Sequence, residues 1–233
     1  MISVKAAAAA SVTLAVSLAT GWTAVRAQTQ APGTTICPPH VDHAGDNHEP
    51  RIVRITLYNH SRFTRADLED LLAVTNRIWS PYGVTMTNES GPGAVAVIVT
   101  DQPTRAAGEL GPIVLGTTLF TEGHATPYIK LSLLAAEMFA DEGVESGLPF
   151  SARPRNQRDE MLTRILGVAF AHEMAHYLLD TSQHSSSGLL QAGLGVRDLT
   201  SPDPGRLKLT PGQERRLARE VGAASPCGDL SVE

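Results

Sequence analysis

The sequence has no large excess of charge of one sign, few aromatic residues and only two cysteines. Lys and Arg number 19 against 24 Asp and Glu, which gives a formal net charge of −5. This charge balance does not suggest a polyanion or an anionic membrane as partner, so nucleic acid is not an expected ligand. With 42% hydrophobic and 18% charged residues, the composition is typical of a globular protein and excludes disorder, collagen and coiled coil.

Long apolar runs are absent too, except at the N-terminus. There Lys5 precedes a mostly apolar run over residues 6–19, and Val25-Arg26-Ala27 supplies small residues for cleavage, which is typical of a secretory signal peptide over residues 1–27. A membrane anchor is the weaker interpretation, because Ser and Thr side chains dilute a run that is shorter than the roughly 20 residues a span needs. We therefore expect a secreted or periplasmic protein with no stable membrane insertion after cleavage.

The two cysteines, Cys37 and Cys227, lie near the two ends of the mature chain. In an oxidising compartment the simplest expectation is a disulfide between them, and the alternative is a Cys37 thiolate that blocks a metal site. Residues 28–50 are rich in Pro and Gly and predict an extended arm. Polar side chains in this arm form either a second metal site or a solvated tail: His40, Asp42, His43, Asp46 and His48.

Hydrophobic patterning predicts a strand, a helix, four strands and then a long helix. The strands are expected over residues 51–58, 84–86, 94–100, 113–120 and 127–133. The first helix is expected to follow Thr64, with Asp67 completing a capping box, and to end near Ser80-Pro81. Helical turns over 134–140 and a loop over 143–155 come before the long helix. A last helix, capped by Thr210 and Gln213, is expected to end near Gly222.

The long helix, over residues 157–180, carries the most informative motif. Six residues recur at steps of three and four and share one core-facing side of the helix: Met161, Ile165, Val168, His172, His176 and Leu179. His172-Glu173-Met174-Ala175-His176 places two imidazoles one helical turn apart, which is the spacing that coordinates zinc. Zinc lowers the pKa of a bound water, and an adjacent carboxylate can take the proton as that water attacks a polarised carbonyl.

The motif therefore predicts Zn²⁺ as cofactor, His172 and His176 as ligands, and Glu173 as the general base of amide hydrolysis. The alternative is a helix whose two histidines are ordinary core or surface residues. The presence of Glu173 disfavours this alternative, because placing an ionisable group beside a core-facing stripe costs free energy unless a metal or hydrogen bonds compensate the charge.

A catalytic zinc needs a third protein ligand, and His184 is the first choice. It lies eight residues after His176, beyond a helix end indicated by Asp180-Thr181-Ser182. The rival ligands are Asp180 itself and Glu214, which would have to come from the last helix. His184 as an exposed loop residue with no role is a further alternative.

The HEMAH sequence, the downstream His184 and Gly188-Leu189-Leu190-Gln191 together resemble the zincin metallopeptidases, especially their metzincin branch. The resemblance implies an α+β fold over residues 51–222, with a zincin-like mixed β-sheet, a long active-site helix and a small, mostly helical or irregular C-terminal part. Residues 223–233 would then be a tail. It also implies that the strand bordering the site holds an extended substrate, for which 113–120 is the candidate and an ordinary structural strand is the alternative.

The sequence departs from the metzincin pattern at several positions. Leu179 and Ser182 stand where that pattern has glycine and the third histidine, and Leu190 stands at the methionine of the turn beneath the metal. No tyrosine follows this turn, since the last one is Tyr177, so the oxyanion stabiliser stays unassigned.

Three hypotheses follow from the sequence. The first is an exported zinc metalloendopeptidase that acts on peptides or proteins, with Glu173 activating the water. The second is a non-catalytic zincin-like domain that binds a peptide or protein, and a zinc hydrolase of a non-peptide amide is a weaker third. Peptide turnover separates them. The sequence indicates no particular oligomeric state.

Overall fold

The computed structural model describes residues 50–105, 113–142, 149–201, 203 and 207–223. The predicted signal peptide, both cysteines and the polar cluster of the N-terminal arm lie outside these residues, as does nearly all of the predicted tail. No helix of the described residues combines the length and the apolarity that crossing a membrane requires.

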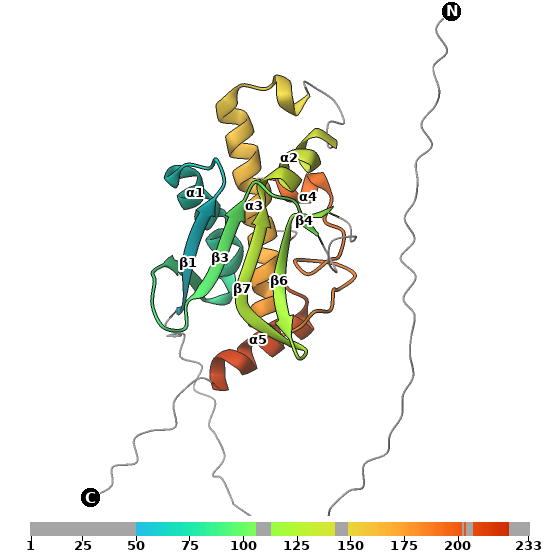
Figure 1. Ribbon diagram of the computed structural model, residues 1–233. Helices are drawn as coiled ribbons and strands as arrows, with labels where there is room; N and C mark the ends of the chain where they lie inside the picture. The colour runs from blue at the N-terminus through green and yellow to red at the C-terminus, as the bar shows by residue number, and fades with distance from the viewer. Residues whose placement is uncertain (1–49, 106–112, 143–148, 202, 204–206, 224–233) are drawn as a thin grey trace, which may run out of the picture. The chain divides into compact units, whose positions relative to one another are not determined.

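The first layer of the fold is a mixed sheet of five strands in the order β2-β1-β3-β7-β6 (Figure 1). β1 is parallel to β2 and β3, β3 is parallel to β7, and β6 runs antiparallel to β7 as an edge strand. A separate antiparallel pair joins β4 and β5. The strands are β1 (Arg51–His60), β2 (Val84–Asn88), β3 (Val95–Thr100), β4 (Thr104–Arg105), β5 (Ile113–Val114), β6 (Gly116–Thr121) and β7 (His124–Ser132).

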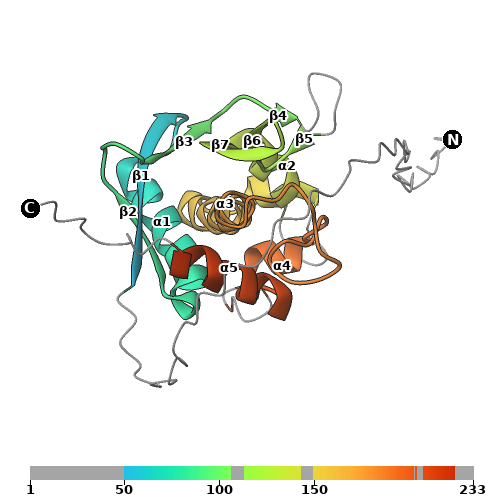
Figure 2. The same cartoon turned by 90° about the horizontal axis from the view of Figure 1, so that it is seen from below.

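The second layer consists of helices packed on one face of this sheet. Figure 2 shows α3 at the centre, with the sheet on one side, α1 beside it and α4 and α5 on the other side. The Thr75 hydroxyl donates to the Gly167 carbonyl (3.0 Å) and the Trp79 indole to the Ala171 carbonyl (3.2 Å), so α1 is bonded to α3 as well as packed on it. The helices are α1 (Arg65–Trp79), η1 (Ser80–Tyr82), α2 (Leu133–Glu142), η2 (Phe150–Ala152), α3 (Arg155–Leu178), α4 (Val196–Thr200) and α5 (Pro211–Ala223).

The predicted α+β class is confirmed, as are both capping boxes. Thr64 and Asp67 bond each other's backbone N–H groups at the start of α1, and Thr210 and Gln213 do the same at the start of α5. Both capping boxes could be predicted from the sequence, because a cap depends on residues that are close together in the chain.

Three structural predictions need correction. A continuous strand over 113–120 is wrong, because the chain changes partner at Leu115, from β4 to β7. β7 begins at His124 rather than at residue 127, because Glu122 and Gly123 alone make the turn. The core-facing stripe of α3 is wider than predicted, because residues 162–178 are all buried or half-buried between the sheet, α1 and the C-terminal segment, whereas the first turns of the helix are largely exposed.

Candidate metal centre

Three imidazoles meet at the C-terminal end of α3. The last two turns of this helix carry His172 and His176, and the loop that follows carries His184. The ring centroids lie 4.8 Å apart for His172 and His176, 5.3 Å for His172 and His184, and 4.9 Å for His176 and His184. One ligand nitrogen from each ring lies within 4.8 Å of the others, so all three can contact one ion.

Main-chain carbonyls set the tautomer of the two helical histidines. Nδ1 of His172 lies 2.7 Å from the Leu189 carbonyl oxygen, and Nδ1 of His176 lies 2.6 Å from that of Thr181. A carbonyl only accepts, so each Nδ1 carries the proton and each neutral ring presents an Nε2 lone pair. These two Nε2 atoms lie 3.1 Å apart. Two lone pairs at that distance repel each other, whereas a shared cation removes the repulsion, so the donor set fits a metal ion.

Burial keeps these histidines in the form that binds metal. Burial lowers the pKa of His172 to about 4, with a further lowering by His176. Burial also lowers the pKa of His176 and, at the more exposed loop position, that of His184. Neutral imidazole is the ligand form, so no proton competes with a cation here at neutral pH.

Glu173 faces the edge strand β6. Its side chain is only 8% exposed, and burial raises its pKa to about 7. Thr118 of β6 opposes that rise, because its hydroxyl lies 2.8 Å from Glu173 Oε2 and stabilises the charged form. A carboxylate with a pKa near neutrality is suited to take and return a proton.

Gly116 of β6 makes this approach possible. A Cβ at this position would lie 2.9 Å from Cγ of Glu173 and 3.0 Å from Cδ2 of Leu131. Any larger residue would therefore push the strand away from the carboxylate.

The turn after the site is built around Gly188. Its φ of +79° is the left-handed conformation that glycine adopts freely, and an added Cβ would collide with the Lys208 carbonyl. Leu189 N–H donates to that same carbonyl (2.9 Å), which aims its own carbonyl at His172. Leu190, predicted to stand at the methionine position of this turn, is fully buried.

The structure brings His172, His176 and His184 together and leaves the rival ligands outside the cluster. The carboxylate of Asp180 turns to the β6–β7 hairpin, where it accepts from His124 and from the Ala125 N–H, both at 2.7 Å. Glu214 is an exposed residue in the first turn of α5.

Several groups at the site were not anticipated from the sequence: Thr118, Gly116, and the carbonyls of Thr181 and Leu189. The Phe120 ring, whose centroid lies 6.4 Å from that of His176 in an edge arrangement, is another. A glycine inside a predicted strand was the one usable signal, because such glycines often mark a close approach. A carbonyl has no signature in a sequence, since every residue carries one.

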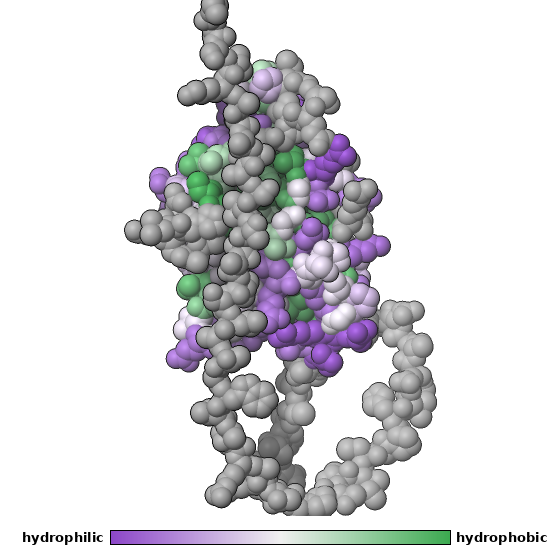
Figure 3. Space-filling model, turned by 90° about the vertical axis from the view of Figure 1, so that its right-hand side faces the viewer, coloured by the Kyte–Doolittle hydropathy of each residue, from purple (hydrophilic) through white to green (hydrophobic). Residues whose placement is uncertain are grey.

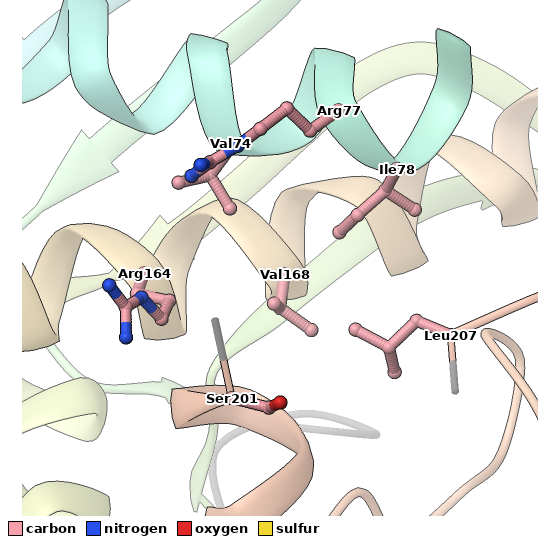
Figure 4. A pocket seen from close by; sticks show the side chains of 7 residues that line it. All are labelled: Val74, Arg77, Ile78, Arg164, Val168, Ser201 and Leu207. Carbon is pink, nitrogen blue, oxygen red and sulfur yellow. The ribbon is translucent and has the colours of Figure 1, made fainter. Parts of the chain in front are cut away.

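Two hollows on the described part of the surface lie away from the histidines. One, shown in Figure 4, lies between α1, α3 and the segment after α4, with Val74, Val168 and Leu207 among its lining residues. At about 10 Å³ it has room for roughly one water molecule. The other, of about 460 Å³, is lined mainly by charged residues near the start of α3, among them Arg155 and Arg158. Neither contains a residue of the three-histidine cluster.

Comparisons with known proteins give a similarity in structure alone. No known protein family matches the sequence, and no curated protein matches it either. The structure is similar to the crystal structure of archaemetzincin from Methanopyrus kandleri, with a TM-score of 0.47 and 10% identity, over 76% of this chain and 98% of that one.

Proposed function

We propose that this chain is an exported zinc metalloendopeptidase. The observation that carries the proposal is the pair of Nε2 lone pairs 3.1 Å apart, with a buried carboxylate on the next residue of the helix. A shared cation removes the repulsion between two such lone pairs. A carboxylate beside a bound cation is the arrangement that activates water. Nitrogen donors suit zinc, and export is supported by the signal-like residues 1–27.

His172, His176 and His184 would hold the ion. When bound, zinc polarises a substrate carbonyl and lowers the pKa of a water molecule. Glu173 would take a proton from the attacking water at a carboxylate oxygen as the water oxygen bonds to the carbonyl carbon. It would return that proton to the amide nitrogen as the C–N bond breaks. Thr118 holds this carboxylate in place during both transfers through its hydroxyl.

The substrate class follows from the strand beside the site. Among the described residues β6 is paired with β7 alone, so its other edge can bond the main chain of an extended peptide. The same strand contributes Thr118 next to Glu173 and Phe120 next to His176, so a peptide on this edge passes the metal ligands. Figure 3 shows hydrophobic and hydrophilic residues side by side on the face of the molecule that lies to the right in Figure 1.

Turnover of a peptide library is the direct test. The purified protein loaded with zinc should cleave peptides, and a chelator should abolish cleavage until zinc is restored. Glu173→Gln should lose at least about 100-fold in kcat while keeping its zinc, because only the proton transfer is removed. Glu160→Gln, which changes an exposed glutamate of the same helix, is the matched control.

The alternative function predicts a different pattern. A non-catalytic binding domain would retain zinc, cleave no peptide under any condition and still bind peptides. Cleavage that responds to a chelator but not to Glu173→Gln would mean that another group is the base.

A further inference from the structure

Asp180 lies at the point where the chain leaves the metal-binding helix. Its φ is +41°, and Glu122 is the other non-glycine residue with a positive φ in the described part of the chain. The left-handed conformation costs a residue with a side chain roughly 1–2 kcal/mol, which Asp and Asn tolerate better than most. This backbone conformation turns the chain from α3 into the loop that carries His184.

The Asp180 carboxylate is bonded to the tip of the β6–β7 hairpin. Oδ1 accepts the Ala125 N–H and Oδ2 accepts from Nδ1 of His124, both at 2.7 Å. These hydrogen bonds, first the one from Ala125, lower the pKa of Asp180, so it is charged at neutral pH. The Asp180 carbonyl also accepts from Arg216 of α5 at 3.2 Å. One residue thus connects the end of α3 with the hairpin and with α5.

The hairpin transmits this connection to the edge strand. Its two-residue turn, Glu122-Gly123, is left-handed at both positions, which is the tight turn that holds two strands in register. In that register Phe120 lies opposite Ala125, and Thr121 lies opposite His124. The two residues that Asp180 bonds are therefore the direct partners of the last two residues of β6, including the Phe120 ring next to His176.

We propose that Asp180 is a positioning residue that clamps the end of the edge strand β6 at a set distance from the metal ligands, and so determines how well an extended peptide binds. This inference rests on the proposed peptidase function. Without the clamp, the end of β6 separates from the end of α3, while Thr118, which comes earlier in β6, keeps its hydrogen bond to Glu173 of α3. Long peptides that pair with the end of β6 then bind more weakly, and short peptides do not.

The Asp180→Gly variant separates the effect of the carboxylate from the effect of the backbone conformation at residue 180. Glycine adopts a φ of +41° without strain, so this variant keeps the turn and loses only the carboxylate. Asp180→Asn keeps an oxygen that can accept the Ala125 N–H and serves as the rescue variant. Asp70→Ala removes an exposed aspartate of α1 and is the matched control.

The experiment compares a ten-residue and a four-residue peptide with a common scissile bond. In Asp180→Gly, KM for the long peptide should rise about tenfold, with kcat for both peptides and KM for the short one within twofold of the wild type. Zinc content and the visible spectrum of the Co²⁺-substituted protein should not change. Asp180→Asn should recover most of the loss in KM, and Asp70→Ala should match the wild type.

Two results would overturn the clamp: an unchanged KM for the long peptide, or a loss of kcat and zinc that is equal for both peptides. If the wild type cleaves neither peptide, the proposed function is wrong. Amide hydrogen exchange then tests separately whether Asp180 holds the end of β6. Faster exchange over residues 119–126 in Asp180→Gly, with the centre of α3 unchanged, supports it. Unchanged exchange over that hairpin refutes it.

Discussion

Replacing Thr118 by valine tests how Glu173, the proposed general base, is held in place. The Thr118 hydroxyl lies 2.8 Å from Oε2 of Glu173, and valine keeps the shape of the side chain but removes the donor. Since that hydrogen bond lowers the pKa of a carboxyl that burial has raised to about 7, its loss should raise this pKa further.

The size of the shift follows from the type of hydrogen bond. A hydrogen bond to a charged group contributes about 1.5–3 kcal/mol, and 1.36 kcal/mol corresponds to one pKa unit. The pKa of Glu173 should therefore rise by about one to two units in Thr118→Val. Because the base must be deprotonated to act, the rising limb of kcat/KM against pH should move upward by the same amount.

Two measurements check this shift. The pH profile of kcat/KM reports it for the zinc-loaded protein, and ¹³C NMR of the Glu173 carboxyl reports it for the metal-free protein. Thr117→Val, which removes the neighbouring hydroxyl on the opposite face of the strand, is the control and should leave both profiles unchanged. Superimposable profiles for Thr118→Val and the wild type would refute the role assigned to this hydroxyl.

Three further predictions concern the metal site. In the folded metal-free protein the pKa of Glu173 is about 7, whereas in the unfolded chain it is near 4.5, so ionisation of Glu173 lowers the free energy of unfolding progressively between these pH values, by at most about 3 kcal/mol. The free energy of unfolding of Glu173→Gln relative to the wild type, measured in urea, should therefore rise over that pH window. A difference that stays constant with pH would contradict this. Gly188→Ala should lower the free energy of unfolding by at least about 1 kcal/mol, because the added Cβ collides with the Lys208 carbonyl. It should also weaken zinc binding, because the Leu189 carbonyl is displaced from His172. Wild-type values in calorimetry and in a zinc titration would contradict both expectations. His184→Ala should reduce zinc affinity at least about tenfold, and Glu214→Ala should leave it unchanged, as measured by competition with a chelator. If Glu214→Ala lost zinc affinity and His184→Ala did not, the third ligand would be Glu214 of α5.

The parts of the site that could be predicted are those with local patterns. The spacing of His172 and His176 places both rings on one side of a helix whatever the rest of the chain does, and His184 was the nearest further imidazole. The caps at Thr64 and Thr210 were predictable for the same reason, because their partners lie three residues away.

The parts that could not be predicted depend on contacts between distant segments. Thr118 meets Glu173 across 55 residues, and Leu189 meets His172 through a main-chain carbonyl. The break at Leu115 depends on which strand lies next to each half of the segment, and periodicity does not contain that information. The carboxylate of Asp180 has the chemistry of a metal ligand, and only its contact with the hairpin shows that it bonds His124 and Ala125 instead.

X-ray absorption at the zinc edge tests the central claim most directly, because it reports the atoms around the ion without relying on any substrate. We expect one zinc per chain with three imidazole nitrogens at about 2.0–2.1 Å and one oxygen ligand from water, falling to two imidazoles in His184→Ala. A purified protein that takes up no zinc, or a spectrum without imidazole scattering, would contradict it.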